Sequence, residues 1–148
     1  MERTFVLVKP DGVQRRLIGE IIRRFENKGL KLVGLKLMNI SKDRAERHYA
    51  IHKGRPFYGD LIQFITSSPS VAMVLEGRDA VKLTRVMMGA TKPEDSTPGS
   101  IRGDFEIYTG QKLVHGSDSP ETARQEIENF FTADELVEYP LCLADWIG

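Results

Sequence analysis

Two short apolar runs, each closed by turn-forming residues, constrain the fold of this chain more than any other feature. Phe5–Val8 is stopped by Pro10–Gly12. Ser70–Leu75 lies between Pro69 and Gly77. A short continuous apolar run with such boundaries is typical of a strand that is covered on both faces. We therefore expect two central strands, the first of which ends in a turn.

Helical patterns alternate with these strands. Ile18, Ile21, Ile22 and Phe25 share one face of a helix that Gly29 would end. A Ser-Pro-Glu sequence at residues 119–121 combines an N-cap, a proline at the first helical position and an early acid, and so predicts another helix. Further predicted elements are a strand at 30–40, helices at 41–49, near 61–65 and at 79–88, and a short strand at 113–115.

The interleaved helices and about four strands suit an α+β sandwich with helices on one face of an antiparallel sheet. A small parallel α/β sheet would suit the pattern almost as well. The sequence contains no repeat, linker or low-complexity segment, so we predict a single domain over residues 1–148. Residues 89–112 are rich in glycine, proline and charge, and a long irregular stretch inside a compact domain is usually functional.

Composition excludes several functional classes. Lys plus Arg and Asp plus Glu both number 21, so the net charge is zero, which argues against a nucleic-acid or anionic-membrane binder. Cys142 is the one cysteine and rules out an intramolecular disulfide, which favours a reducing compartment. The N-terminus resembles no signal peptide, and no apolar run reaches the roughly 18 residues of a membrane span. We predict a cytoplasmic protein.

His115 is the first candidate for chemistry. It lies between a predicted strand and a well-capped helix. Alternation along the strand puts Ser117 on the same side as His115, and Glu126 lies about two helical turns further on. An imidazole that is oriented by a hydroxyl and a carboxylate has the arrangement of a nucleophile. The alternative is a histidine that only caps a turn.

Three cations are the second candidate group. Lys9 ends the first strand, Arg85 lies on the helix before the irregular stretch, and Arg102 lies within it. If they converge, they would bind a polyphosphate and neutralise charge during phosphoryl transfer. Taken singly, each is a solvated surface charge. There is no P-loop, no dinucleotide fingerprint and no zinc spacing. His48 and His52 are four residues apart, but we see no further ligand and expect no metal site there.

At this point the sequence resembles the nucleoside diphosphate kinase family over essentially its whole length. The motifs that carry the resemblance are Lys9–Gln14, Arg55–Phe57, Val71–Val74, Gly89–Thr91, Ser100–Phe105 and His115–Ser119. The resemblance implies a ferredoxin-like sandwich with a four-stranded antiparallel sheet. It also implies a ping-pong reaction, in which the γ-phosphoryl group of a nucleoside triphosphate such as ATP passes to a nucleoside diphosphate through a phosphohistidine.

The resemblance also implies roles for single residues. His115 resembles the phosphorylated nucleophile, and Ser117 and Glu126 resemble the pair that orients it. Phe57, which composition alone places in the core, resembles the side chain that stacks on the base. Mg²⁺ would arrive with the nucleotide, held mainly by phosphates and water rather than by protein ligands. The implied nucleotide contacts are Lys9, Tyr49, Phe57, Arg85, Thr91, Arg102 and Lys112.

The sequence departs from the family at three positions. Lys112 stands where the family usually has an Asn that bonds the ribose; it either replaces that contact and strengthens phosphate binding, or turns to solvent. Arg16 and Ser68 stand where the family often has Gly. The alternative functions are a nucleotide-binding or interaction module whose activity is weakened by Lys112, and a phosphohistidine donor to other proteins.

The expected partners are nucleoside tri- and diphosphates and further copies of this chain, with no membrane and no specific nucleic acid. The C-terminal run at residues 139–148, with its Trp146, resembles the tail that packs between subunits in hexameric members. We therefore favour a hexamer over the tetramer of some bacterial relatives.

Overall fold

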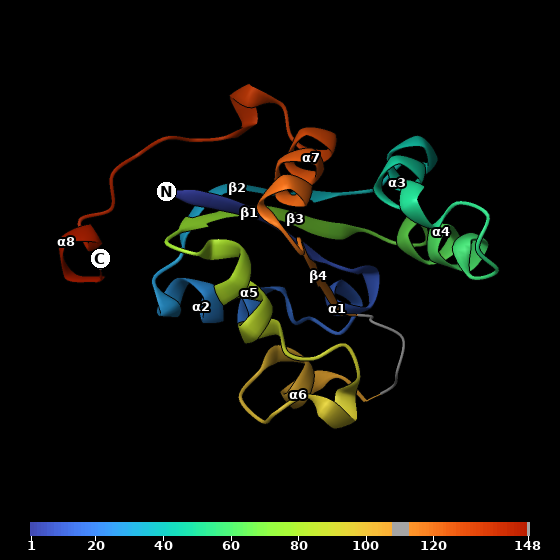
Figure 1. Ribbon diagram of the computed structural model, residues 1–148, viewed down its shortest axis with the longest axis horizontal. Helices are drawn as coiled ribbons and strands as arrows, with labels where there is room; N and C mark the ends of the chain where they lie inside the picture. The colour runs from blue at the N-terminus through green and yellow to red at the C-terminus, as the bar shows by residue number, and fades with distance from the viewer. Residues whose placement is uncertain (108–112, 148) are drawn as a thin grey trace.

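A computed structural model describes residues 1–107 and 113–147 of the chain. Its sheet has the strand order β2-β3-β1-β4, and every neighbouring pair is antiparallel (Figure 1). This confirms the antiparallel prediction, and the parallel alternative is wrong. The strands are β1 (Glu2–Val8), β2 (Lys31–Met38), β3 (Ser70–Gly77) and β4 (Val114–Gly116).

The predicted helices form near their predicted bounds. Ser41 and Ser119 both cap helices, because their hydroxyls accept hydrogen bonds from the amides of Arg44 and Thr122. The predicted turn after β1 is instead a short helix that begins at Pro10, where the fixed φ of proline suits a first turn. The helices are α1 (Pro10–Gln14), α2 (Ile18–Lys28), α3 (Lys42–His48), α4 (Tyr58–Thr66), α5 (Ala80–Met88), α6 (Ile101–Phe105), α7 (Pro120–Phe130) and α8 (Ala144–Ile147), with 3₁₀ turns η1 (Ala50–His52), η2 (Pro93–Asp95) and η3 (Ala133–Glu135).

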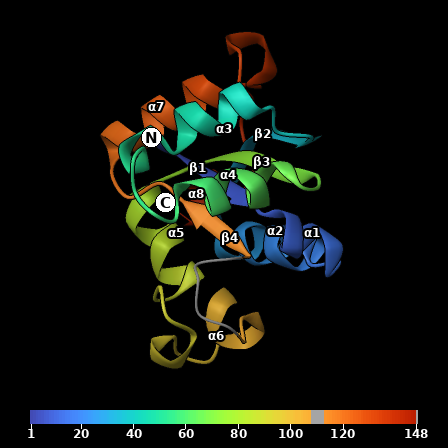
Figure 2. The same ribbon diagram turned by 90° about the vertical axis from the view of Figure 1, so that its right-hand side faces the viewer.

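Helices cover both faces of the sheet, which corrects the expectation of helices on one face only. Alternate side chains of the central strands point to opposite sides. Val6 and Met73 pack in a cluster with residues of α2 and α5. Phe5 and Val74 pack in a second cluster with residues of α3, α4 and α7. Figure 2 shows the sheet between these two layers. The apolar parts of β1 and β3, Phe5–Val8 and Val71–Leu75, are buried on both faces.

The short edge strand β4 is tied to the end of β1. The Lys9 amide donates to the Leu113 carbonyl at 2.9 Å, and the Leu113 amide donates to Oδ1 of Asp11 at 3.1 Å. Leu113 is fully buried and has a φ of 76°, a conformation that side chains rarely adopt outside functional sites. These contacts place His115 opposite Leu7 at the open edge of the sheet.

None of the described helices combines the length and apolarity that crossing a bilayer requires.

Candidate active site

His115, Ser117 and Glu126 come together as the sequence predicts. Nε2 of His115 lies 2.8 Å from Oε2 of Glu126, and Oγ of Ser117 donates to Oε1 of the same carboxylate at 2.5 Å. The strand β4 presents His115, and the capped helix α7 brings Glu126 back over it. Ser117 and Glu126 are buried, whereas a quarter of the His115 side chain (26%) is exposed. One buried carboxylate thus holds both the imidazole and the hydroxyl.

The charge on Glu126 determines which nitrogen of His115 can act as a nucleophile. Burial by itself would raise the pKa of Glu126, but the hydrogen bonds from His115 and Ser117 and the positive charge of protonated His115 outweigh burial and lower it. An ionised carboxylate only accepts hydrogen bonds, so neutral His115 carries its hydrogen on Nε2. Nδ1 then keeps its lone pair and is the nitrogen that can attack an electrophile.

His48 is part of this cluster, and sequence reasoning missed it. Its side chain is 2% exposed, its ring meets the His115 ring edge-on at 4.7 Å, and its Nδ1 lies 3.4 Å from Oε2 of Glu126. Burial, and secondarily the charge of His115, lowers the pKa of His48 to about 3, so its ring is neutral. The available signal was its place three residues after buried Ala45, on the apolar face of α3.

His48 and His52, four residues apart in the sequence, do not share a helix. His52 lies beyond the end of α3, in η1, and its ring packs against Phe57 with the centroids 5.3 Å apart. His48 instead has two potential co-ligands that the sequence analysis did not find. One ligand atom from each of His48, His115 and Glu126 lies within 4.8 Å of the other two.

Arg85 and Arg102 converge on the strand that carries His115. Arg102 donates to the carbonyls of Gly89 and Val114, each at 3.0 Å, and Arg85 donates to the carbonyl of Gly116 at 3.1 Å. The residues on both sides of His115 are thus held by guanidinium groups. Arg102 is only 7% exposed, and a planar fork that bonds two carbonyls fixes its direction.

Lys9 completes the cationic group at the end of β1. Its side chain is buried, and burial together with the nearby charge of Arg102 lowers the pKa of Lys9 to about 8. An anion bound beside Lys9 would offset both effects. A phosphate is therefore a ligand that suits this arrangement.

The other predicted contacts lie around this centre. Tyr49 is buried, and burial together with the charge of Glu126 raises its pKa to about 12, which keeps its hydroxyl protonated. Phe57 is 46% exposed at the start of α4, which frees its face for stacking. Thr91 is exposed on the segment between α5 and α6. Lys112 lies outside the described residues.

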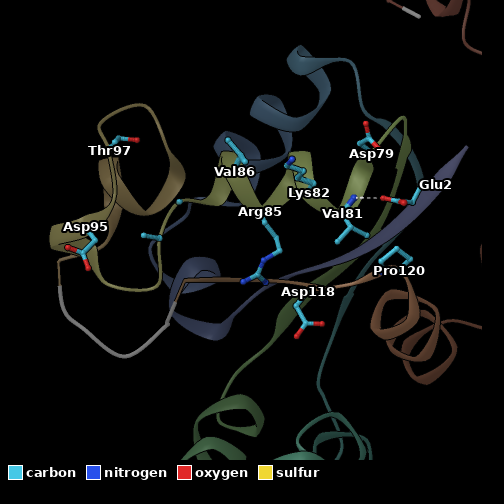
Figure 3. A pocket seen from close by; sticks show the side chains of 12 residues that line it. Glu2, Asp79, Val81, Lys82, Arg85, Val86, Asp95, Thr97, Asp118 and Pro120 are labelled. Carbon is cyan, nitrogen blue, oxygen red and sulfur yellow. Dashed lines mark hydrogen bonds between the residues drawn. The ribbon is translucent and has the colours of Figure 1, made fainter.

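A cleft of about 600 Å³ adjoins the site on the side of α5. Its lining includes Arg85, Gly89 and Asp118, and Figure 3 shows Arg85 reaching from α5 towards Asp118. His115 is not part of this lining. Arg85, which lines the cleft and also bonds the carbonyl of Gly116, therefore connects the cleft to the strand that carries His115.

The chain is similar to known proteins over nearly its whole length. A family model described as nucleoside diphosphate kinase matches residues 2–136. A nucleoside diphosphate kinase of Bacillus licheniformis is 56% identical over 147 residues, and one of Cyanothece sp. is 59% identical over 147 residues; each alignment covers 99% of both chains. The solved structure of a halophilic nucleoside diphosphate kinase from Halobacterium salinarum in complex with CDP matches with a TM-score of 0.96 and 50% identity, covering 99% of this chain and 98% of that one. A nucleoside diphosphate kinase family protein from Babesia bovis matches with a TM-score of 0.97 and 45% identity over the whole of both chains.

Proposed function

This chain belongs to the nucleoside diphosphate kinase family and is a phosphotransferase with that activity, and we propose that it works through a covalent phosphohistidine at His115. The observation that carries the proposal is the 2.8 Å contact between Nε2 of His115 and Glu126, because it leaves Nδ1 with a lone pair. Full-length relatives that are named as this enzyme favour it over the alternative of a weakened binding module.

In the first half-reaction, Nδ1 of His115 attacks the γ-phosphorus of a nucleoside triphosphate. The bond from that phosphorus to the bridging oxygen breaks, and its electron pair leaves with the nucleoside diphosphate. The imidazole gains a positive charge, which the negative Glu126 stabilises at 2.8 Å. In the second half-reaction, a terminal oxygen of another nucleoside diphosphate attacks the phosphorus, and the N–P electron pair returns to Nδ1.

Lys9, Arg85 and Arg102 would bind the phosphates. They surround the end of β4, and their charges oppose the negative charge that collects on the transferring group. A kinase that uses nucleotides generally needs a divalent cation, and we assign Mg²⁺. Among the described residues, the group of side chains that could bind a metal ion is His48, His115 and Glu126, and it offers two nitrogens. Mg²⁺ prefers oxygen ligands, so it would be held by the phosphates and water instead. Bound to the phosphates, Mg²⁺ would neutralise their charge.

Phe57 would stack on the base, and Tyr49 and Thr91 would contact the sugar and phosphates. A stacked ring makes no hydrogen bond to a base edge, so we expect tolerance for all nucleobases. The solved relative from Halobacterium salinarum contains CDP, which supports a nucleoside diphosphate as ligand. For Lys112 both earlier hypotheses stay open, and the nucleotide affinity and turnover of Lys112→Asn separate them.

We also propose a cytoplasmic homo-oligomer, a hexamer rather than a tetramer. The single cysteine of the chain suits a reducing compartment. In the C-terminal tail, Leu143, Trp146 and Ile147 are exposed in a single copy, at 55%, 85% and 51%. Side chains of this kind gather at subunit interfaces. Light scattering of the purified protein distinguishes six subunits from four.

The test is a labelling experiment with γ-labelled ATP and magnesium. We expect acid-labile label on the wild type and on a His52→Ala control, and none on His115→Ala. Unlabelled GDP should then discharge the label into GTP. If the wild type binds nucleotide but stays unlabelled, the phosphohistidine proposal fails, and Lys112→Asn becomes the first reversion to make.

A further inference from the structure

His48 has no role in the proposed transfer, yet its position is unusual for a histidine. Both ring nitrogens are buried, and neither has a hydrogen-bond partner among the described residues. A buried polar group without a hydrogen-bond partner costs free energy, so it needs an explanation. One explanation is a bound ion that takes the place of the missing partner. Two neighbouring groups, His115 and Glu126, could bind the same ion as His48.

We propose that His48, His115 and Glu126 form a binding site for Zn²⁺ or a similar transition-metal ion, which holds the enzyme in an inactive state. Two neutral imidazoles and one carboxylate are a ligand set that proteins use for zinc when one coordination position stays open. This site is distinct from magnesium, which would arrive with the nucleotide.

The distances need only small adjustments. Ligand atoms about 2.0–2.2 Å from a tetrahedral zinc ion lie roughly 3.3–3.6 Å from one another. Nδ1 of His48 is already 3.4 Å from Oε2 of Glu126. Nε2 of His115 is 2.8 Å from the same oxygen and would move outward. One ligand atom from each of the three residues already lies within 4.8 Å of the other two. His115 can make this movement, because it lies at the open edge of the sheet with a quarter of its side chain exposed.

The surroundings hold the other two ligands in place. The His48 ring makes edge-on contacts with Tyr49 and Phe130, with centroid distances of 4.7 and 5.5 Å. Ser117 donates to the second oxygen of Glu126 and fixes the direction of the carboxylate. Such a bond to a metal-binding carboxylate strengthens a metal site. The fourth position would face the open side of His115 and be filled by water.

Zinc at this site would stop the proposed chemistry through the tautomer of His115. With Glu126 as the partner, the hydrogen is on Nε2 and the lone pair is on Nδ1. A metal ion on Nε2 needs that nitrogen's lone pair, so the hydrogen moves to Nδ1, and the attacking nitrogen loses its nucleophilic electrons. Conversely, a phosphoryl group on Nδ1 leaves the hydrogen on Nε2 and excludes the metal. Metal binding and phosphorylation therefore oppose one another to the same extent.

The test begins with the unphosphorylated protein, free of nucleotide, titrated with Co²⁺ and followed by its visible spectrum. We expect the intense bands of four-coordinate cobalt at one ion per chain, and their loss when Zn²⁺ is added. His48→Phe keeps an aromatic ring and removes both nitrogens, and it should weaken zinc binding at least about tenfold, since even the loss of an outer hydrogen bond costs 10–100-fold. His52→Phe, the matched control, should bind as the wild type does.

A second readout needs no variant. Long-range ¹H–¹⁵N spectra of the wild type should show Nδ1 of His48 and Nε2 of His115 shifting together when zinc is added. Equal zinc affinity in His48→Phe and the wild type, or zinc that shifts only His52, would overturn the proposal. The cobalt and nitrogen readouts do not depend on the phosphohistidine. A third readout, in which bound zinc blocks labelling by ATP and a chelator restores it, rests on the proposed function. The zinc site and the phosphohistidine proposal can therefore fail separately.

Discussion

Oε2 of Glu126 lies 2.8 Å from Nε2 of His115, and this one contact joins the edge strand β4 to helix α7. The other oxygen of the carboxylate accepts a hydrogen bond from Ser117. The carboxylate therefore selects the tautomer of His115, fixes the direction of its ring and lies ready to balance the charge of a phosphorylated imidazole.

Removing the charge of Glu126 should slow phosphorylation of His115 without unfolding the protein. Glu126→Gln keeps the size of the side chain but stabilises the imidazolium less, so we expect a fall of about 10²- to 10³-fold in the rate of label transfer. Rapid-quench labelling with ATP measures this step. Glu128→Gln, which changes an exposed residue of the same helix, is the control and should label at the wild-type rate. Equal rates for both variants would contradict the assigned role.

Lys9 should give the enzyme an alkaline limit near pH 8. Burial and the charge of Arg102 lower the pKa of Lys9 to about 8, so the cation is present below that pH and is lost above it. Because phosphate binding needs the cation, kcat/KM should fall above pH 8 by about tenfold per pH unit. Lys9→Arg serves as the comparison, because arginine keeps its charge at these pH values. The pH above which kcat/KM falls should therefore be higher in that variant. An unchanged limit in that variant would assign it to another group.

His48 should make the fold sensitive to mild acid. Its pKa is about 3 in the folded chain, against about 6.5 when unfolded, so the unfolded chain binds the extra proton first. Stability is complete above pH 6.5 and falls as the pH decreases towards 3. Between pH 6.5 and 4.5 the loss is about 2–3 kcal/mol. Urea unfolding in the presence of a chelator measures it. The free energy of unfolding of His48→Phe should change little with pH over this range, whereas that of His52→Phe should fall as in the wild type. A pH dependence like the wild type's in His48→Phe would refute the assignment.

Arg16 should be replaceable by glycine with a gain in stability. Its φ is 61°, in the left-handed region where a side chain costs free energy, and the residue is exposed, so little packing is lost. We expect Arg16→Gly to raise the free energy of unfolding by about 0.5–1 kcal/mol, measured by urea unfolding. Ser68→Gly is the matched substitution, because Ser68 has no positive φ and should gain nothing. A loss in Arg16→Gly would show that its side chain contributes to stability.

Local pattern was sufficient for most of the elements. Ser119 and Pro120 predict the start of α7, and the continuous apolar runs predict β1 and β3, because capping and burial on both faces act on neighbouring residues. The covering of the sheet was harder to predict. An apolar strand does not reveal which helices lie on which face, so the second helical layer was missed.

The sequence by itself determined the chemistry available to this protein: a histidine before a capped helix, a hydroxyl two residues on and a carboxylate in the helix, with the motifs of a known family. Only the tertiary structure decided which groups meet. His48 lies 67 positions before His115 in the chain. The two rings meet because His115 pairs with Leu7, whose side chain lies on the face of the sheet that α3 covers. Contacts of such long range depend on the packing of whole elements, and no local pattern specifies them.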